Sequence, residues 1–354
     1  MKKIVIAICF AMALLVASLL NKTAFAMGEC GLSCCVAGAA SSGITLAPNL
    51  GISIQYENSQ MKTLKNGKSE VSPGEVLNAV SSTWPAMPMT TKRFSIPVDM
   101  TMQKYTLTVA RPVTERLRLL AIVPYVENDM KMRTITRSTM GMDMTMDMTM
   151  DTVRGLGDAT LMALYDAYTD SFVRSGQRLT LGLGIKTPTG RNDEKTQNGS
   201  LVHAMMQPGS GSWDALFMAN YMKAYYPLVL QANLLYHLTT EGDMGYEFGD
   251  QTSLDLIARY QALDYVNLGL ELNGIYAGKD TDHDGRYSRP ETSLVDNTDN
   301  TGIKSVFVSP GIQVKIPGTG GNFGLKLQIP IYQSANGTQQ VLDMRTLASL
   351  AWNF

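Results

Sequence analysis

Apolar and polar residues alternate with a period of two along most of this chain, and residues 344–354 show the pattern clearly. Ala348, Leu350, Trp352 and Phe354 are apolar, whereas most residues between them are polar or small. A strand that faces hydrocarbon on one side and water on the other has this period, with aromatic residues at the membrane interface. Because an unpaired sheet edge is too costly in lipid, this strand predicts a sheet that closes on itself.

The same alternation recurs in eleven segments before the last one. They cover residues 44–56, 104–109, 116–125, 158–167, 178–186, 214–221, 228–237, 253–261, 266–273, 305–315 and 322–331. Together with the last strand they make twelve. An even number of strands places both termini of the chain on the same, periplasmic side of the membrane.

The connections between these segments sort by length. Short connections lie at 111–115, 224–227, 263–264 and 317–321, with a middling turn at 170–176, and they alternate with long polar ones at 57–99, 130–157, 189–212, 239–249 and 278–302. A soluble β-sandwich would also alternate, but its connections would not sort in this way. The sequence therefore predicts an all-β fold, a closed antiparallel transmembrane β-barrel of about twelve strands with short periplasmic turns and long external loops.

The amino-terminal segment is predicted to direct export. Lys2 and Lys3 precede an apolar run, and Ala24-Phe25-Ala26 is a small-x-small cleavage site, so residues 1–26 read as a cleaved signal peptide. A retained membrane anchor is the alternative. Residues 27–43 then form a periplasmic segment that contains cysteines, and residues 44–354 form the barrel.

Composition narrows the partners and argues against enzymes. Charged residues are 17% of the chain and the net charge is -1, which gives no reason to expect nucleic acid. We expect contacts with outer-membrane lipid and small solutes, and recognition of the terminal Phe354 by the barrel assembly machinery. The histidines His203, His237 and His283 lie in no recognisable catalytic constellation, so the chain is not expected to be an enzyme. A barrel hydrolase with a Ser–His pair at its rim is the alternative.

Charged residues at the inward positions of the strands are candidates to line the lumen, the interior of the barrel. Both signs occur, so neighbouring charges can pair across strands and neutralise one another. Twelve strands enclose a narrow space, which permits a small pore. The candidates are Lys104, Arg116, Arg118, Asp158, Asp166, Arg178, Lys186, Asp214, Asp255, Arg259, Glu271, Lys315, Lys326 and Arg345.

A candidate calcium loop follows the ninth strand. Asp280, Asp282, Asp284, Gly285 and Glu291 match the pattern D-x-D-x-D-G-x5-E, in which alternate carboxylates converge on a hard cation and the last closes the sphere. No flanking helices are expected here, so a solvated acidic loop is the alternative. Calcium would fix an external loop; no cofactor is required for the predicted function.

A methionine-rich stretch lies in the second long connection. Met140, Met142, Met144, Met146, Met148 and Met150 alternate with glycine, aspartate and threonine. Thioethers suit soft ions such as Cu(I) or Ag(I). The favoured interpretation is an amphipathic β-arm that extends the second external hairpin, whose flexible apolar face can also line the mouth for apolar solutes.

The cysteines of the exported chain are clustered before the first strand. Cys30, Cys34 and Cys35 allow one short disulfide and leave one thiol over. A metal or cluster site would need a fourth ligand, and none is evident nearby. A local disulfide is the favoured interpretation.

Four stretches resemble a family of outer-membrane transporters linked to the meta-cleavage pathway of phenol degradation. They are Gly155-Leu-Gly157-Asp158, which opens a strand containing Tyr165, then Gly184-Ile-Lys186-Thr-Pro188-Thr-Gly190, Gln207-Pro-Gly209-Ser-Gly211-Ser-Trp-Asp214, and Ser309-Pro310-Gly311-Ile312-Gln313. The resemblance spans roughly residues 154–354 and implies a channel-like barrel for solute uptake. It supplies no catalytic residues, and the glycines and prolines of the motifs are interpreted as strand-end and loop geometry.

These observations predict an outer-membrane channel of a Gram-negative bacterium for passive uptake of small, apolar or aromatic, solutes. Two alternatives come from other classes of protein. One is a structural or partner-binding barrel, such as a sheath for a periplasmic redox protein. The other is a metal-handling protein that uses the methionine-rich stretch.

Overall fold

The computed structural model describes residues 50–171, 176–196 and 199–354. The predicted signal peptide, the cysteine segment with Cys30, Cys34 and Cys35, and the start of the first predicted strand lie outside the described residues.

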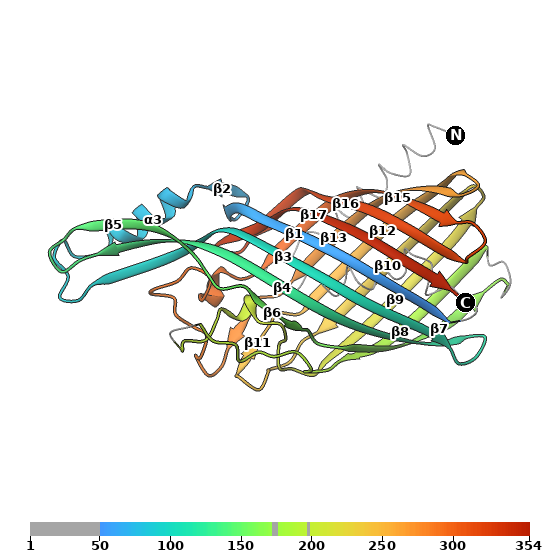
Figure 1. Ribbon diagram of the computed structural model, residues 1–354, viewed down its shortest axis with the longest axis horizontal. Coiled ribbons are helices and arrows are strands. Elements are labelled where there is room, and N and C mark those ends of the chain that lie inside the picture. Colours follow the sequence, from blue (N-terminus) through green and yellow to red (C-terminus); the bar gives the residue numbers. More distant parts are fainter. Residues whose placement is uncertain (1–49, 172–175, 197–198) are drawn as a thin grey trace.

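Twelve strands of the described chain form one closed antiparallel barrel, which confirms the predicted fold (Figure 1). Each pairs with its neighbours along the chain, and the last pairs with the first from Gly51 opposite Asn353 to Asn66 opposite Thr338. The strands are β1 (Gly51–Asn66), β3 (Lys92–Pro112), β4 (Leu117–Arg137), β7 (Thr160–Thr169), β8 (Gln177–Lys186), β9 (Asp214–Tyr225), β10 (Leu228–Leu238), β12 (Gln251–Leu263), β13 (Val266–Ala277), β15 (Ile303–Ile316), β16 (Gly321–Ala335) and β17 (Thr338–Asn353).

Alternation along each strand places its two faces in different surroundings. On β8, Leu181, Leu183 and Ile185 are exposed on the outer surface, whereas Thr180 and Lys186, which flank them, are buried in the lumen. Successive side chains of a strand point to opposite faces, so the apolar set meets lipid and the polar set meets the interior. Within the described ranges no helix has both the length and the apolar character needed to cross a bilayer.

Two of the long connections are largely regular structure rather than irregular loop. Strands β1, β3 and β4 continue beyond the barrel and carry β2 (Ser69–Val71), helix α3 (Pro73–Ser82), β5 (Asp143–Thr149) and β6 (Val153–Leu156). Figure 1 shows β3, β4, β5 and α3 projecting at the end opposite the carboxy terminus; this projection is called the arm below. Continued period-two alternation through residues 92–102 and 128–137 lets both strands extend.

Helix α3 packs on one face of the arm. Its start is fixed by a capping box, in which Ser72 and Glu75 satisfy each other's backbone N–H groups. Leu77 of the helix joins Phe94, Ile96 and Ile135 of the sheet in a buried cluster. This packing stabilises strands that no longer have a closed barrel around them.

The remaining connections fold together over the barrel's external end. They contain the 3-10 turns η2 (Ala204–Met206) and η3 (Thr298–Asn300) and the short pair β11 (Tyr246–Glu247) and β14 (Thr281–Asp282). At the other end, the connections that are described throughout, residues 113–116, 226–227, 264–265 and 317–320, are short turns, as predicted.

Candidate functional site

The lumen holds a cavity of about 1410 Å³, open solvent at its edge included, toward the external end. Much of its wall is apolar, and polar and charged side chains lie on its deeper surface. The apolar lining includes Met61, Met102, Ile122, Met205, Phe248, Phe307, Val341 and Leu342, and the polar lining includes Glu57, Lys104, Asn128, Asp158, Lys186 and Arg345.

One charged cluster lies where the first and last strands meet. Glu57 on β1 accepts from Lys104 on β3 at 3.0 Å and from Arg345 on β17 at 2.9 Å. Arg345 is 2% exposed and also donates to Ser59 (2.9 Å) and Gln328 (2.7 Å). Because each charge has an opposite partner and further hydrogen bonds, the cluster can be kept in the lumen without stranded charge.

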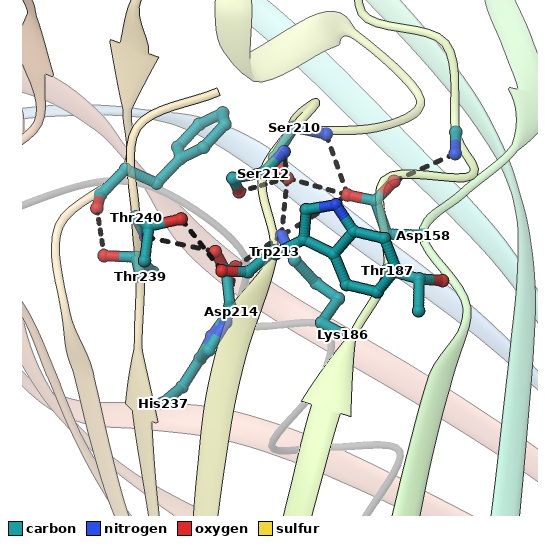
Figure 2. Close-up of polar contacts among 12 residues, drawn as sticks. Asp158, Lys186, Thr187, Ser210, Ser212, Trp213, Asp214, His237, Thr239 and Thr240 are labelled. Carbon is teal, nitrogen blue, oxygen red and sulfur yellow. Dashed lines mark hydrogen bonds and ion pairs between the residues drawn. The ribbon is translucent and has the colours of Figure 1, made fainter. Parts of the chain in front are cut away.

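A second cluster joins Asp158, Lys186, Asp214 and His237 (Figure 2). The Lys186 ammonium lies 2.7 Å from Asp214 and 3.3 Å from Asp158. The Nε2 of His237 lies 2.8 Å from the Oδ2 of Asp214, which is the same oxygen that Lys186 contacts. One lysine thus bridges two carboxylates that come from different strands and loops.

The second cluster holds a segment of chain inside the barrel. Asp158 accepts from the backbone N–H of Gly190 (2.9 Å) and from the N–H and hydroxyl of Ser210 (both 2.8 Å). Gly190 and Gly209 touch there: a Cβ on Gly209 would lie 2.5 Å from the carbonyl of Gly190. The close approach therefore requires glycine at both positions.

Three of the stretches that carry the family resemblance thus meet around Asp158. Sequence reasoning interpreted their glycines as strand-end geometry and did not bring the stretches together. The signal was present in their polar residues, because Asp158, Lys186, Ser210 and Asp214 belong to the same short stretches as those glycines. This convergence shapes the deep wall of the cavity.

A third cluster pairs Asp166 with Arg118 and Arg178, at 2.5 Å and 3.7 Å, with Thr180 donating at 2.7 Å. It lies on β4, β7 and β8 nearer the short-turn end of the barrel.

A fourth cluster lines a smaller cavity of about 540 Å³ toward the short turns. Lys326 pairs with Glu271 at 2.8 Å, and Arg259 donates to Gln231 at 2.9 Å. Asp255 accepts from Asn273 at 2.9 Å and is buried. Of the other residues predicted to line the lumen, Arg116 lies exposed in the turn before β4, and Lys315 lies exposed near the end of β15.

The inward face also carries an apolar cluster that the sequence reading did not identify. Its members face the lumen on β3, β4, β7, β9 and β10: Ala110, Leu120, Ile122, Met162, Leu164, Leu216, Met218 and Leu235. Glycines at 182 and 184 on β8 make room for these side chains. Residues 119–123, where alternation gives way to a continuous apolar run, were the available signal. The expectation of a polar inner face is therefore wrong for this part of the wall.

The carboxylates of the candidate calcium loop take separate partners. Asp280 accepts from the Tyr246 hydroxyl (2.7 Å), Asp282 accepts from the backbone of Tyr287 (2.9 Å), and Asp284 pairs with Arg286 (3.1 Å). Glu291 is exposed in a turn. No group of three or more His, Cys, Asp or Glu in the described chain is placed to hold a metal ion. The four carboxylates as arranged do not fit one calcium ion, and calcium binding stays a prediction.

Tyrosine hydroxyls help to join the external connections over the cavity. Tyr246 is buried, and burial together with Asp280 raises the pKa of its hydroxyl well above the usual value. Burial also raises the pKa of Tyr287 to about 12, and its hydroxyl donates to the carbonyl of Asn192. Both phenols therefore stay protonated as hydrogen-bond donors at any physiological pH.

The methionine-rich stretch forms β5 and its flanks. β5 pairs antiparallel with β4, as the β-arm interpretation predicts, and Met140, Met142, Met144, Met146 and Met148 are exposed, whereas Met150 packs partly against a buried cluster. Binding of a soft metal there stays a prediction.

Comparison with known proteins agrees with this architecture. A family model described as "Putative MetA-pathway of phenol degradation" matches residues 86–319, which include all four stretches quoted for the resemblance. No curated protein matches the chain.

Among solved structures, an outer membrane channel from Pseudomonas putida F1 is 13% identical, with a TM-score of 0.54 over 86% of this chain and 96% of that chain. A FadL homologue from Pseudomonas aeruginosa is 10% identical (TM-score 0.42, 94% and 100% covered), and the toluene transporter TodX from Pseudomonas putida is 9% identical (TM-score 0.43, 94% and 96% covered). The first of these similarities supports a shared fold.

Proposed function

Because the chain belongs to the family described as "Putative MetA-pathway of phenol degradation" and has the fold of an outer-membrane channel, we propose that it conducts small apolar or aromatic solutes across the outer membrane. Its export by a cleaved signal peptide and its insertion through the terminal Phe354 belong to this proposal. No chemistry is assigned to the barrel.

The observation that carries the proposal is the lining of the lumen cavity. An aqueous pore is lined by polar side chains, whereas most of the surface of this cavity is apolar and comes from methionine, phenylalanine and aliphatic side chains. Concave, mostly apolar pockets with a few polar groups are typical of sites for small organic ligands. The charged side chains in its wall would orient a solute or admit a little water.

The interior also disfavours free passage of hydrophilic solutes. In the described residues the external cavity and the smaller cavity near the short turns are separate, and between them lie buried Glu57, Leu347 and Asn273. Passage from one to the other therefore requires side chains to move. This supports selective conduction rather than an open water-filled pore.

Vesicles with a lipopolysaccharide outer leaflet provide the test. We expect the barrel to accelerate entry of N-phenyl-1-naphthylamine, a neutral aromatic that fluoresces in apolar surroundings, but not osmotic swelling with arabinose. Equal acceleration of both would indicate a general pore, and no acceleration of either would reject a channel. Ser305→Trp, which adds an indole to the cavity wall, should slow aromatic entry, and Ser305→Ala is its matched control.

A further inference from the structure

The two faces of the arm differ in what covers them. On one face, α3 packs on Phe94 and Ile135, and Asp143 and Asp147 of β5 pair with Arg137 (2.6 Å) and Arg133 (2.7 Å). On the other face β5 presents only methionines, at positions 144, 146 and 148, and Met142 precedes them directly before the strand. These methionines are between 41% and 63% exposed, so this face is accessible from solvent.

The uncovered methionines continue the inner wall of the barrel. Met148 stands opposite Met132 on β4, and two residues along β4 Met130 stands opposite Met100 on β3, which in turn stands opposite Met61 on β1. Directly opposed residues of paired strands point to the same face of a sheet. Since Met100 and Met130 point into the barrel, the exposed methionines of β5 lie on the same continuous surface.

Burial increases steadily along this surface toward the lumen. Exposure falls from 63% at Met144 to 49% at Met146 and 41% at Met148, then to 5% at Met132 and 0% at Met100. The methionine row is defined here as these side chains together with their inner neighbours: Met61, Met100, Met102, Met130, Met132, Met142, Met144, Met146, Met148, Met150, Met205 and Met206.

The methionine row also joins two cavities. Met150, with Val153 and Val202, lines a surface cavity of about 590 Å³ beside the arm. Met102 and Met205 line the lumen cavity. Between the two cavities the buried cluster consists of methionine and valine alone, so most of the side chains that separate the outside from the lumen are flexible, unbranched methionines.

We propose that the methionine row is an external capture site for neutral aromatic solutes, which bind on the exposed face of β5 and pass along the row into the lumen cavity. This inference rests on the proposed function and extends it to the place where the solute first binds. Thioether sulfur makes favourable contacts with aromatic rings, and methionine rotamers adapt to different ligand shapes.

The surroundings of the row favour a neutral solute over a soft metal cation. The carboxylates of β5 point to the opposite face and are already paired, and the buried part of the row contains no acidic side chain. The Arg93 guanidinium donates to the sulfur of Met148 at 3.4 Å, which places a positive charge beside that thioether. Moving a cation into an apolar cluster without a counter-charge is strongly unfavourable, whereas an apolar solute gains from burial there.

Direct binding can be measured with methionine ε-methyl ¹³C labels on the full barrel in lipid nanodiscs. Naphthalene should shift the methyl signals of Met144, Met146 and Met148 through its ring current. Single Met→Leu variants assign these signals. Shifts confined to lipid-facing or unrelated methyls would overturn the proposal, whether or not the barrel conducts.

Uptake provides the second measurement. The variant M142T/M144T/M146T/M148T keeps residues suited to a strand but removes the apolar face, whereas M142L/M144L/M146L/M148L keeps an apolar face without sulfur. At low micromolar N-phenyl-1-naphthylamine we expect entry through the threonine variant to fall roughly two- to tenfold and entry through the leucine variant to stay near wild type. At saturating solute all three rates should converge, because the lumen cavity is unchanged.

The outcomes distinguish capture by the methionine row from conduction through the channel. An unchanged rate for the threonine variant at low solute would reject capture by the arm while leaving the channel itself intact. An equal loss in both variants, accompanied by Ag(I)-dependent methyl shifts in the wild type, would show that sulfur binds a metal and would overturn the proposal. If the wild-type barrel accelerates nothing, the proposed function fails, and the naphthalene titration still decides whether the row binds aromatic solutes.

Discussion

The guanidinium of Arg345, on the last strand, lies 2.9 Å from the carboxylate of Glu57, on the first. The contact crosses the seam where β17 and β1 close the barrel, and it also forms part of the wall of the lumen cavity. Closure of the fold and construction of the site therefore depend on the same pair of side chains. Lys104 supplies a second positive charge at 3.0 Å from the same carboxylate.

Removing the charge of Arg345 should destabilise the barrel. Arg345→Gln leaves Glu57 with a single cationic partner in a buried place, and breaking a buried pair costs roughly 3–5 kcal/mol. The midpoint of urea unfolding in detergent micelles measures the change. Because Lys104 remains, we expect the lower end of that range.

Two further variants test the cause. The double variant E57Q/R345Q removes the carboxylate that Arg345→Gln leaves with one partner, but it also takes that carboxylate from Lys104, so we expect it to recover only a small part of the loss. Lys131→Gln removes an exposed ion pair of the arm with Asp99 and should cost about 0–1 kcal/mol. An equal loss from Lys131→Gln and Arg345→Gln would contradict the argument from burial.

Neutralising Asp158 should loosen the segment that it holds inside the barrel. Asp158→Asn loses the ion pair with Lys186 and weakens the bonds from Gly190 and Ser210. We expect amide hydrogen exchange in residues 204–212 to accelerate by an amount equivalent to about 1–3 kcal/mol. Asp264→Asn, in an exposed periplasmic turn, should leave these amides unchanged; if both variants behave alike, the anchoring role is wrong.

The contact between Gly190 and Gly209 should not tolerate a side chain. Gly209→Ala places a methyl group 2.5 Å from the carbonyl of Gly190, and overpacking of this kind typically costs about 1–3 kcal/mol. Gly74→Ala, in the first turn of α3 with open space around it, serves as the control. Thermal melting followed by circular dichroism should separate the two, and equal melting temperatures would disprove the close approach.

His283 should titrate above its usual range. A hydrogen bond with Glu247 raises the pKa of the imidazole, because that carboxylate stabilises the charged form. The contact is therefore fully present below the unfolded-state pKa of about 6.5 and is lost as pH rises through the higher folded-state value. Histidine ¹³C NMR titration of the folded barrel measures the pKa of His283, and Glu247→Gln should return this pKa toward about 6.5. An unchanged pKa in that variant would point to another cause.

The alternation of residues by itself determined the strands, their two faces and the closure of the sheet. A period of two is a local property of extended backbone, and lipid forbids an open edge, so twelve strands and their approximate positions followed without knowledge of tertiary contacts. Leu181 and Leu183 faced lipid for that reason alone. The β-arm at residues 143–149 was predictable on the same ground.

Only the tertiary structure decided which side chains meet. In a closed barrel each residue contacts partners on neighbouring strands, and these partners are determined by the strand register and by the path of the loops. The period-two pattern gives no information about the register or about the loop path. Glu57 therefore pairs with Arg345 across the seam between the first and last strands. Asp158 contacts Lys186 and Gly190 where the loops fold into the barrel. The carboxylates at 280 and 282 bond to separate partners despite their metal-like spacing. Asp280 bonds to Tyr246, which is distant in the sequence, and Asp282 bonds to the nearby backbone N–H of Tyr287, so the metal-like spacing did not by itself bring the carboxylates to one point.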